Sequence, residues 1–329
     1  MRVLVADKME AEGLEGLRGL GCEVVFDPDC SADGLSGVIA RVEPAVVVVR
    51  STKVRAEALG ASGQLRMVIR AGSGYDSIDT DAASAKGVAV CNCPGMNAVA
   101  VAELAMGLMI ACDRRVPDQV ADWRGGAWRK GEYAKARGLK GRTLGVVGVG
   151  NIGSELVARA RAFGMPCVAW SAHMTPDRAR ALDATSGGTT REDLLAMVGR
   201  CDVLSVHVAL TDATRGLCDG AFFAAMREGA VFINTSRGEV VDEAAMRRAV
   251  LERGIRCGLD VQAMQPAGKA ADWDSPLVDL PGIYATHHVG ASTEQAQMAV
   301  ADEVVRIVGA LKDNGSLVNL VNEPVGTTG

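Results

Sequence analysis

The glycine-rich stretch from Arg142 to Gly153, RTLGVVGVGNIG, constrains the fold of this chain more than any other feature. An apolar run, Leu144 to Val147, leads into three glycines spaced G-x-G-x-x-G, and a helix-like run from Ser154 to Phe163 follows. In such a strand–turn–helix, the first glycine permits the tight turn and the second lets a pyrophosphate approach the backbone. The third lets the helix pack close to the strand. Because both flanks fit, we favour a dinucleotide site here over an ordinary glycine turn.

Short β-branched runs alternate with helical patterns on both sides of this motif. Before it, we predict strands over Arg2–Ala6, Glu23–Phe26, Ala45–Val49 and Met67–Ala71, and helices over Glu12–Leu20 and Ser36–Val42. After it, we predict strands over Cys167–Trp170, Val203–Val208, Val231–Asn234, Arg256–Val261 and Ile283–Ala285, and helices over Arg191–Met197, Glu243–Glu252 and Glu294–Lys312. Such alternation predicts an α/β protein with parallel sheets that are covered on both faces.

Two segments lie between these series. The apolar sequence from Ala98 to about Cys112 predicts a long helix, and we expect this helix to bridge two domains. Residues 113–141 are polar but carry Trp123, Trp128 and Tyr133, which is typical of a surface loop or of an arm that contacts a second subunit. We favour the arm. Farther upstream, the turn from Gly72 to Asp76 follows a predicted strand, and it is either a ligand loop for a carboxylate or a simple glycine turn.

Composition narrows the class of protein. A length of 329 residues suits about two domains, and 48% hydrophobic with 23% charged residues indicates a globular protein with an ample core. A net charge of −5 gives no electrostatic reason to expect nucleic acid or an acidic membrane surface. No apolar run is long enough to span a membrane, and the start, MRVLVADKM, does not resemble a signal peptide. We therefore expect a cytoplasmic protein.

The cysteines and histidines do not suggest a metal site. Nine cysteines are scattered, and the spacing of Cys91 and Cys93 suits neither a C-x-x-C redox pair nor a zinc site. The four histidines are not at ligand spacing from any cysteine, and the adjacent His287 and His288 lack a suitably spaced third ligand. We expect reduced thiols and no bound metal.

Several motifs together resemble the D-2-hydroxyacid dehydrogenase family, particularly its phosphoglycerate dehydrogenase-like branch. They run in order from the first strand to about Asn322 and comprise RAGSGYD (70–76), NCPGMNAVAVAE (92–103), the glycine motif, SVHVALTDAT (205–214), INTSRGEVVD (233–242), GLDV (258–261) and THHVGAST (286–293). The resemblance implies two Rossmann-like domains with doubly wound parallel sheets, the substrate domain being interrupted by the cofactor domain. We therefore expect a substrate-binding domain over 1–97 and 289–329, and a dinucleotide-binding domain over 98–288. The resemblance also implies a homodimer, with residues 113–141 as the dimerisation arm.

The resemblance assigns catalysis to three residues. Arg237 binds the substrate carboxylate, for which a guanidinium is suited because it makes two parallel hydrogen bonds. His288 exchanges the hydroxyl proton while hydride passes between the substrate and NAD, and Gln265 occupies the place of the partner of this histidine. Further implied substrate contacts are Ser51, Gly72, Ser73 and Gly74. Implied cofactor contacts are Gly148, Gly150, Asn151, Ile152, Gly153, Ser171, His207, Ala209, Thr214, Thr235, Asp260 and Gly290.

Two departures from the family pattern leave alternatives open. Gln265 replaces the usual glutamate and carries no charge to stabilise an imidazolium. Formate dehydrogenases of the same superfamily have glutamine there, so oxidation of a formate-like substrate or an aldehyde hydrate is one alternative to reduction of a 2-keto acid. A dinucleotide-sensing regulator without turnover is another. Secondly, Ser171 occupies the position at which an acidic residue usually binds the adenosine ribose, and Arg178 follows farther along the chain. No negative charge there would repel the 2′-phosphate of NADP, so NADP is not excluded as the cofactor.

The substrate implied is a D-2-hydroxy acid, 3-phosphoglycerate or hydroxypyruvate-like. Arg50 and Lys53 follow the predicted strand Ala45–Val49. These basic side chains either bind a phosphate group of the substrate or are simply exposed to solvent.

Overall fold

The computed structural model describes residues 1–266 and 270–325, and the chain divides into two compact units. Unit 1 comprises Met1–Asn97 and Ser292–Gly329, and unit 2 comprises Ala98–Ala291. The second division therefore falls after Ala291 rather than after residue 288, and residues 326–329 of the expected segment lie outside the described residues.

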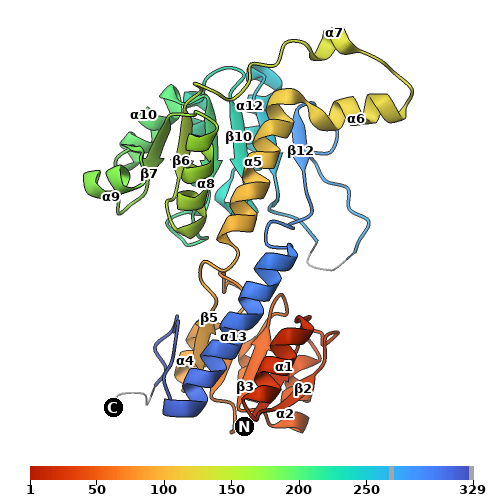
Figure 1. Ribbon diagram of the computed structural model, residues 1–329, viewed down its shortest axis with the longest axis vertical. Coiled ribbons are helices and arrows are strands. Elements are labelled where there is room, and N and C mark those ends of the chain that lie inside the picture. The colour runs from red at the N-terminus through yellow and green to blue at the C-terminus, as the bar shows by residue number, and fades with distance from the viewer. Residues whose placement is uncertain (267–269, 326–329) are drawn as a thin grey trace. The chain divides into compact units, whose positions relative to one another are not determined.

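Unit 1 is built on a five-stranded parallel sheet in the order β2-β1-β3-β4-β5 (Figure 1). Its strands are β1 (Arg2–Val5), β2 (Glu23–Phe26), β3 (Val46–Val49), β4 (Met67–Arg70) and β5 (Ala89–Asn92). Its helices are α1 (Ala11–Gly19), α2 (Leu35–Val42), α3 (Ala56–Leu59), α4 (Thr80–Ala85) and α13 (Glu294–Asn314). Successive strand side chains point to opposite faces, and both faces are covered: Val46 and Val48 pack with α1 and α13, whereas Val47 and Val49 pack with α2 and α3.

Unit 2 is built on a seven-stranded parallel sheet in the order β12-β11-β10-β9-β6-β7-β8. Its strands are β6 (Leu144–Val147), β7 (Cys167–Trp170), β8 (Thr185–Ser186), β9 (Val203–Val206), β10 (Val231–Asn234), β11 (Arg256–Leu259) and β12 (Ile283–Ala285). The chain moves outward from β6 through β7 and then returns to β9 on the other side. The strand order therefore reverses between β6 and β9, the position at which open α/β sheets bind dinucleotides.

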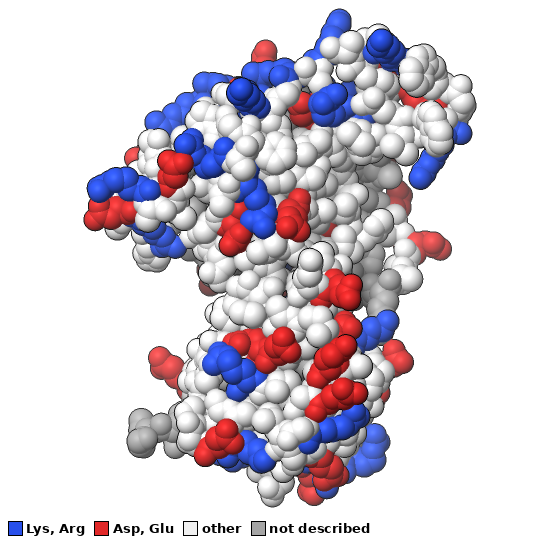
Figure 2. Space-filling model, in the orientation of Figure 1, with Lys and Arg blue, Asp and Glu red and all other residues white. Residues whose placement is uncertain are grey.

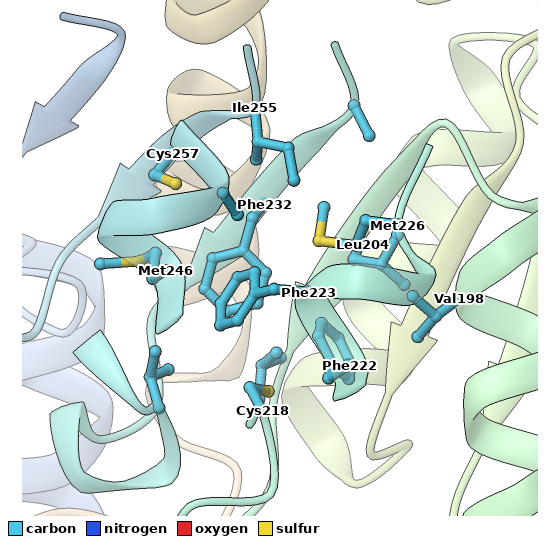
Figure 3. Packing of buried hydrophobic residues seen from close by; sticks show 14 of the residues in the cluster. Val198, Leu204, Cys218, Phe222, Phe223, Met226, Phe232, Met246, Ile255 and Cys257 are labelled. Atoms are coloured by element: carbon cyan, nitrogen blue, oxygen red, sulfur yellow. The ribbon is translucent and has the colours of Figure 1, made fainter. Parts of the chain in front are cut away.

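Helices cover both faces of this second sheet. The helices of unit 2 are α5 (Ala98–Arg114), α6 (Val116–Arg124), α7 (Lys130–Tyr133), α8 (Asn151–Ala162), α9 (Pro176–Ala181), α10 (Arg191–Arg200), α11 (Gly220–Ala225) and α12 (Glu243–Arg253), of which α6 and α7 bury no residue. On one face, α10, α11 and α12 enclose Phe222, Phe223 and Phe232, whose rings meet edge to face with centroids 5.1–6.0 Å apart (Figure 3). On the other, α5 and α8 pack on the sheet. The prediction of an α/β class with two parallel sheets is confirmed.

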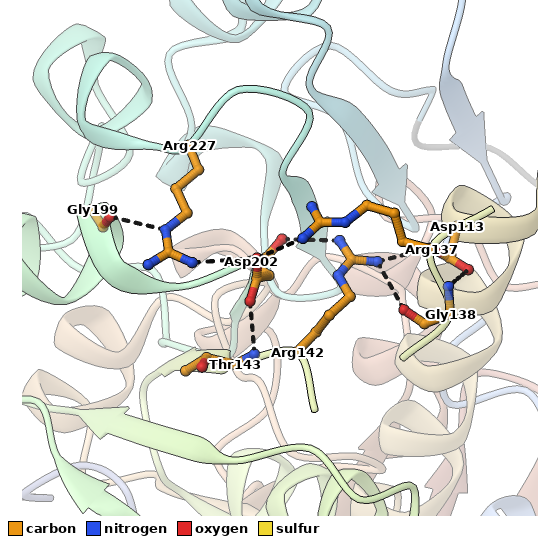
Figure 4. A network of polar contacts seen from close by, with 8 residues as sticks. All are labelled: Asp113, Arg137, Gly138, Arg142, Thr143, Gly199, Asp202 and Arg227. Carbon is orange, nitrogen blue, oxygen red and sulfur yellow. Dashed lines mark hydrogen bonds and ion pairs between the residues drawn. The ribbon is translucent and has the colours of Figure 1, made fainter. Parts of the chain in front are cut away.

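A polar network at the amino ends of β6 and β9 ties the end of α5 to the sheet (Figure 4). Arg142 and Asp113 form a buried ion pair with 2.8 Å between Nη1 and Oδ1. Beside them, Asp202 accepts the backbone N–H of Thr143 and pairs with Arg137 and Arg227. Desolvation alone would raise the pKa of Asp202, but these hydrogen bonds and positive charges outweigh it and lower the pKa.

The surface of each unit carries intermixed acidic and basic side chains on the face shown in Figure 2. Among the described residues, no helix combines the length and apolar character needed to cross a bilayer.

Candidate functional site

The glycine turn between β6 and α8 leaves room for a ligand at one glycine only. Gly148 has a φ of +93°, and a Cβ there would lie 2.8 Å from the carbonyl oxygen of His207. A Cβ on Gly153 would lie 2.2 Å from the carbonyl oxygen of Gly148. Gly150, which caps the start of α8, has no atom within 4 Å of its Cβ position. Thus two glycines are required by the fold, and the third opens the helix N-terminus to an approaching phosphate.

The neighbouring strand end places an uncharged histidine beside this turn. His207 follows β9, and its ring nitrogens lie 2.8 Å from Ser205 Oγ and 3.4 Å from Thr235 Oγ1. Burial lowers the pKa of His207 to about 3, so the ring is neutral near pH 7. Farther along, Thr214 Oγ1 donates to the carbonyl oxygen of Ala209 at 2.6 Å and closes the loop that follows His207.

At the end of β7, the structure brings a positive charge toward the glycine turn. Ser171 Oγ accepts from the backbone N–H of His173 at 3.2 Å. Arg178, on α9, donates through Nη2 to the carbonyl oxygen of Val149 at 2.6 Å. The guanidinium therefore lies next to the glycine turn. Sequence reasoning noted Arg178 only as a nearby basic residue.

Arg237 lies on a turn that is fixed by the side chain of Asn234. The Asn234 Oδ1 accepts from Ser236 N and Ser236 Oγ at 3.0 and 2.8 Å, while its Nδ2 donates to the carbonyl oxygen of Arg237 at 2.9 Å. Next to it, a Cβ on Gly238 would lie 2.1 Å from the backbone of Gln262 and Ala263, so the turn packs directly on the loop after β11. Arg237 is thereby placed at the carboxyl end of β10.

Asp260, after β11, organises the turn that carries His288. This carboxylate is 2% exposed and accepts from Thr286 Oγ1 at 2.6 Å and from the N–H groups of Val289 and Gly290 at 2.9 and 2.8 Å. Its backbone carbonyl accepts from the N–H of His288 at 2.8 Å. His288 has a φ of +54°, a left-handed conformation that costs a non-glycine residue free energy. The hydrogen bonds to Asp260 hold the turn in this conformation.

Gln265 contacts His288 directly, with 2.6 Å between Gln265 Nε2 and His288 Nδ1. Both side chains line a cavity of about 640 Å³ within unit 2, together with Gln262, Trp273, Ser275 and His287. The pairing of Gln265 with His288, which the family resemblance implies, is present as a contact in the structure.

The expected substrate residues of unit 1 lie on two loops at the carboxyl ends of its strands. Asp7 accepts the N–H groups of Arg50, Ser51 and Thr52 at 2.8–3.1 Å and so shapes the loop after β3. After β4, Ser73 Oγ donates to Asn97 Oδ1 at 2.7 Å. Gly72 has a φ of +150° and lies over the Arg70 guanidinium, where a Cβ would meet Nη1 at 1.6 Å.

Within the described ranges, no cluster of three or more histidine, cysteine, aspartate or glutamate residues is arranged to hold a metal ion.

Comparison with known proteins decides the family. Residues 106–290 match the model of the D-isomer specific 2-hydroxyacid dehydrogenase, NAD binding domain. Hydroxypyruvate reductase of Thermotoga maritima is 37% identical over 306 residues, which cover 92% of this chain and 96% of that protein. The chain belongs to the D-2-hydroxyacid dehydrogenase family. The resemblance inferred from the motifs is confirmed.

Two further relatives indicate the range of this family of NAD(P)-dependent oxidoreductases. D-3-phosphoglycerate dehydrogenase of Methanocaldococcus jannaschii is 35% identical over 98% of this chain, but the chain spans only 60% of the length of that relative. An NADPH-dependent glyoxylate/hydroxypyruvate reductase of Sinorhizobium meliloti, solved with NADP and malonate, has a TM-score of 0.82 and 29% identity. That match covers 98% of this chain and 97% of the reductase.

Sequence reasoning missed several residues that shape the site of this family member. Asp7 and Asn234 each fix a loop by hydrogen bonds to backbone groups, and Gln262 accepts from the hydroxyl of Ser275. Asp7 and Gln262 lie outside the quoted motifs, whereas Asn234 lies within INTSRGEVVD without a role assigned to it. The one available signal was position, because Asp7 and Asn234 stand at or near the carboxyl ends of predicted strands.

Proposed function

We propose that this chain catalyses the NAD(P)-dependent interconversion of a D-2-hydroxy acid and its 2-keto acid. The observation that carries the proposal is the placement of Arg237, Asp260 and His288. They follow the three adjacent strands β10, β11 and β12, and each lies on a turn held by hydrogen bonds. A reaction that depends on the orientation of its reacting groups requires side chains that are held rigidly in this way.

Arg237 would hold the substrate carboxylate, since its planar guanidinium can donate two parallel hydrogen bonds. His288 would bind the oxygen on C2. Bound nicotinamide would supply or accept the hydride. Gly150 and the N-terminus of α8 would receive the pyrophosphate, and Asp260 would keep the His288 turn in register with Arg237. The substrate contacts assigned to Ser51 and to Gly72–Gly74 are part of the same proposal.

For the substrate, we favour a small 2-keto acid such as hydroxypyruvate or its 3-phosphorylated form. The names of the Thermotoga and Methanocaldococcus relatives support this class. The cofactor is NAD or NADP, and the Arg178 guanidinium beside the glycine turn supports acceptance of the 2′-phosphate of NADP.

The test is oxidation of NADH and NADPH by the purified protein with a panel of 2-keto acids, followed by absorbance. We expect turnover with at least one keto acid. Arg237→Ala should lower kcat/KM on the order of a hundredfold, and Arg237→Lys should recover only part of it because a lysine cannot donate in parallel. Arg180→Ala, which removes an exposed guanidinium on α9, is the matched control and should leave kcat/KM unchanged.

Two other results would redirect the proposal. Turnover of formate or an aldehyde hydrate without activity on keto acids would favour the alternative that Gln265 suggests. Cofactor binding without turnover of any substrate would favour a dinucleotide-sensing regulator.

A further inference from the structure

The amide of Gln265 has one orientation that the surrounding chain permits. Its Oε1 lies 3.0 Å from the backbone nitrogen of Gln262, which can only donate, and its Nε2 lies 2.6 Å from His288 Nδ1. If the amide were turned over, its NH₂ group would face the N–H of Gln262, donor against donor. The hydrogen-bonding partners therefore determine which end of the amide faces His288, independently of how oxygen and nitrogen are assigned.

The donor that enforces this orientation is itself held in place. The N–H of Ala263 donates to Glu243 Oε1 at 2.8 Å, and Ser275 Oγ donates to the side-chain oxygen of Gln262 at 2.6 Å. The backbone of Gln262 and Ala263 also packs directly on Gly238, where a Cβ would have no space. The loop after β11 is thus fixed by a carboxylate, a hydroxyl and a backbone contact, so the N–H of Gln262 keeps its direction.

We propose that Gln265 is a positioning residue that holds His288 as the neutral tautomer with its proton on Nε2. The reason is that an amide NH₂ can only donate, so Nδ1 must present its lone pair to Gln265 and the ring proton must reside on the other nitrogen. A glutamate at this position would do the opposite, because a carboxylate accepts a hydrogen bond from Nδ1–H and so keeps that nitrogen protonated, and its charge favours the imidazolium.

This inference rests on the proposed function and refines its substrate preference. With the proton on Nε2, His288 offers a hydrogen-bond donor to an oxygen of the substrate and no lone pair on that nitrogen. A carbonyl oxygen can accept from such a donor, whereas a hydroxyl group awaiting deprotonation needs an acceptor. The site therefore favours binding of the keto acid over the corresponding hydroxy acid. This preference applies to bound ground states, in which no bond forms or breaks.

The direct test is nuclear magnetic resonance of protein labelled with ¹⁵N in its histidine rings. The four histidines make assignment tractable, with His288→Asn identifying the signal of interest. In the unmodified protein without substrate, we expect His288 to show a protonated Nε2 and an unprotonated Nδ1. Gln265→Glu should transfer the proton to Nδ1 or protonate both nitrogens. Gln119→Glu, which adds the same charge on α6, should leave the His288 signals unchanged.

A functional readout accompanies the spectrum. At a pH where the ring of His288 in the Gln265→Glu protein is neutral with its proton on Nδ1, this substitution should raise the affinity for the hydroxy acid relative to the keto acid by about tenfold, the effect of gaining or losing one hydrogen bond. If Gln265→Glu does not fold, Gln265→Met removes the amide at similar length and should yield a mixture of both tautomers.

The outcomes separate this inference from the proposed function. A proton on Nδ1 of His288 in the unmodified protein would overturn the inference even if the enzyme is active. An Nε2–H tautomer in a protein that turns over no keto acid would leave the inference standing and remove the proposed reaction.

Discussion

Asp260 is the single residue on which most of the His288 turn depends. Both of its carboxylate oxygens accept hydrogen bonds from the segment after β12, and it is almost fully buried. The family resemblance implies a cofactor contact for this residue, and we retain that as a proposal. In either role, a substitution of Asp260 disturbs the left-handed backbone of His288, so a loss of activity alone would not identify a cofactor contact.

A substitution at the end of β7 should change cofactor preference. We predict that the kcat/KM values of the unmodified protein for NAD and NADP differ by no more than about two orders of magnitude. The reason is that position 171 is occupied by a serine and not by the acidic residue that usually binds the adenosine ribose. Ser171→Asp should shift kcat/KM toward NAD because a carboxylate accepts from ribose hydroxyls and repels a 2′-phosphate. Ser171→Ala is the uncharged control. A preference for NAD of more than about ten-thousandfold in the unmodified protein would contradict the prediction.

A second residue-level prediction concerns the charge of His207. Because burial lowers its pKa to about 3, its ring should stay neutral from about pH 8 to about pH 5 in the folded protein. The unfolded chain takes up a proton near the ordinary pKa of 6.5, so His207 favours unfolding as the pH falls below that value. Ring-proton magnetic resonance, assigned with His207→Gln, measures this directly. A His207 signal that titrates near pH 6.5 would show that water reaches the ring.

At the scale of elements, the buried strands were the most predictable part of the fold. The run Val46–Val49 is apolar and β-branched, and the structure buries all four side chains. Short helices were missed although their caps are visible: Asp79 caps α4 and Asp219 caps α11 by accepting from a backbone N–H. Helix α8 begins at Asn151 rather than at the predicted Ser154, since the glycine turn already supplies its first residues.

The site was less predictable than the strands. Motifs located Arg237, Gln265 and His288, but the hydrogen bonds that orient them come from residues such as Asn234, Asp260 and Gln262. Those bonds depend on backbone conformation across several loops, and residue type and spacing do not encode it. The tautomer of His288 is one such property, because it follows from a backbone N–H rather than from any side chain in a motif.

The ion pair that joins α5 to β6 should be important for stability. The side chains of Asp113 and Arg142 are 4% and 8% exposed, so Asp113→Ala leaves a buried guanidinium without its partner. We expect the free energy of unfolding to fall by about 3–5 kcal/mol, measured by urea denaturation. Asp177→Ala, which breaks an exposed pair with Arg180, should have little effect. Equal effects of the two substitutions would contradict this account.

At the scale of the whole molecule, the segment that holds α6 and α7 predicts self-association. Trp123 and Trp128 are 71% and 81% exposed, and they border an apolar hollow of about 500 Å³ with Val116 and Val120. Isolated surfaces rarely leave two indoles in water, so we predict a two-fold dimer that covers them.

Light scattering at micromolar concentration tests the dimer. The unmodified protein should have the mass of two chains, and Trp123→Glu combined with Trp128→Ser should shift it to that of one chain with helical content retained. Leu251→Glu, at an exposed apolar position on α12, should not change the mass. A monomer in the unmodified protein at this concentration would refute the prediction.

The division of unit 1 into two stretches of chain has a consequence for synthesis on the ribosome. Val304, Ile307 and Val308 of α13 complete the core that Val3 and Val46 begin, yet α13 follows the whole of unit 2. Roughly 200 residues separate the two stretches, and at about 5–20 residues per second their translation takes roughly 10–40 s. By the end of that interval unit 2 has all of its strands, whereas one face of the first sheet still lacks its covering helix. The order of translation thus favours folding of unit 2 first. Unit 1 can complete its core only when α13 has left the ribosome.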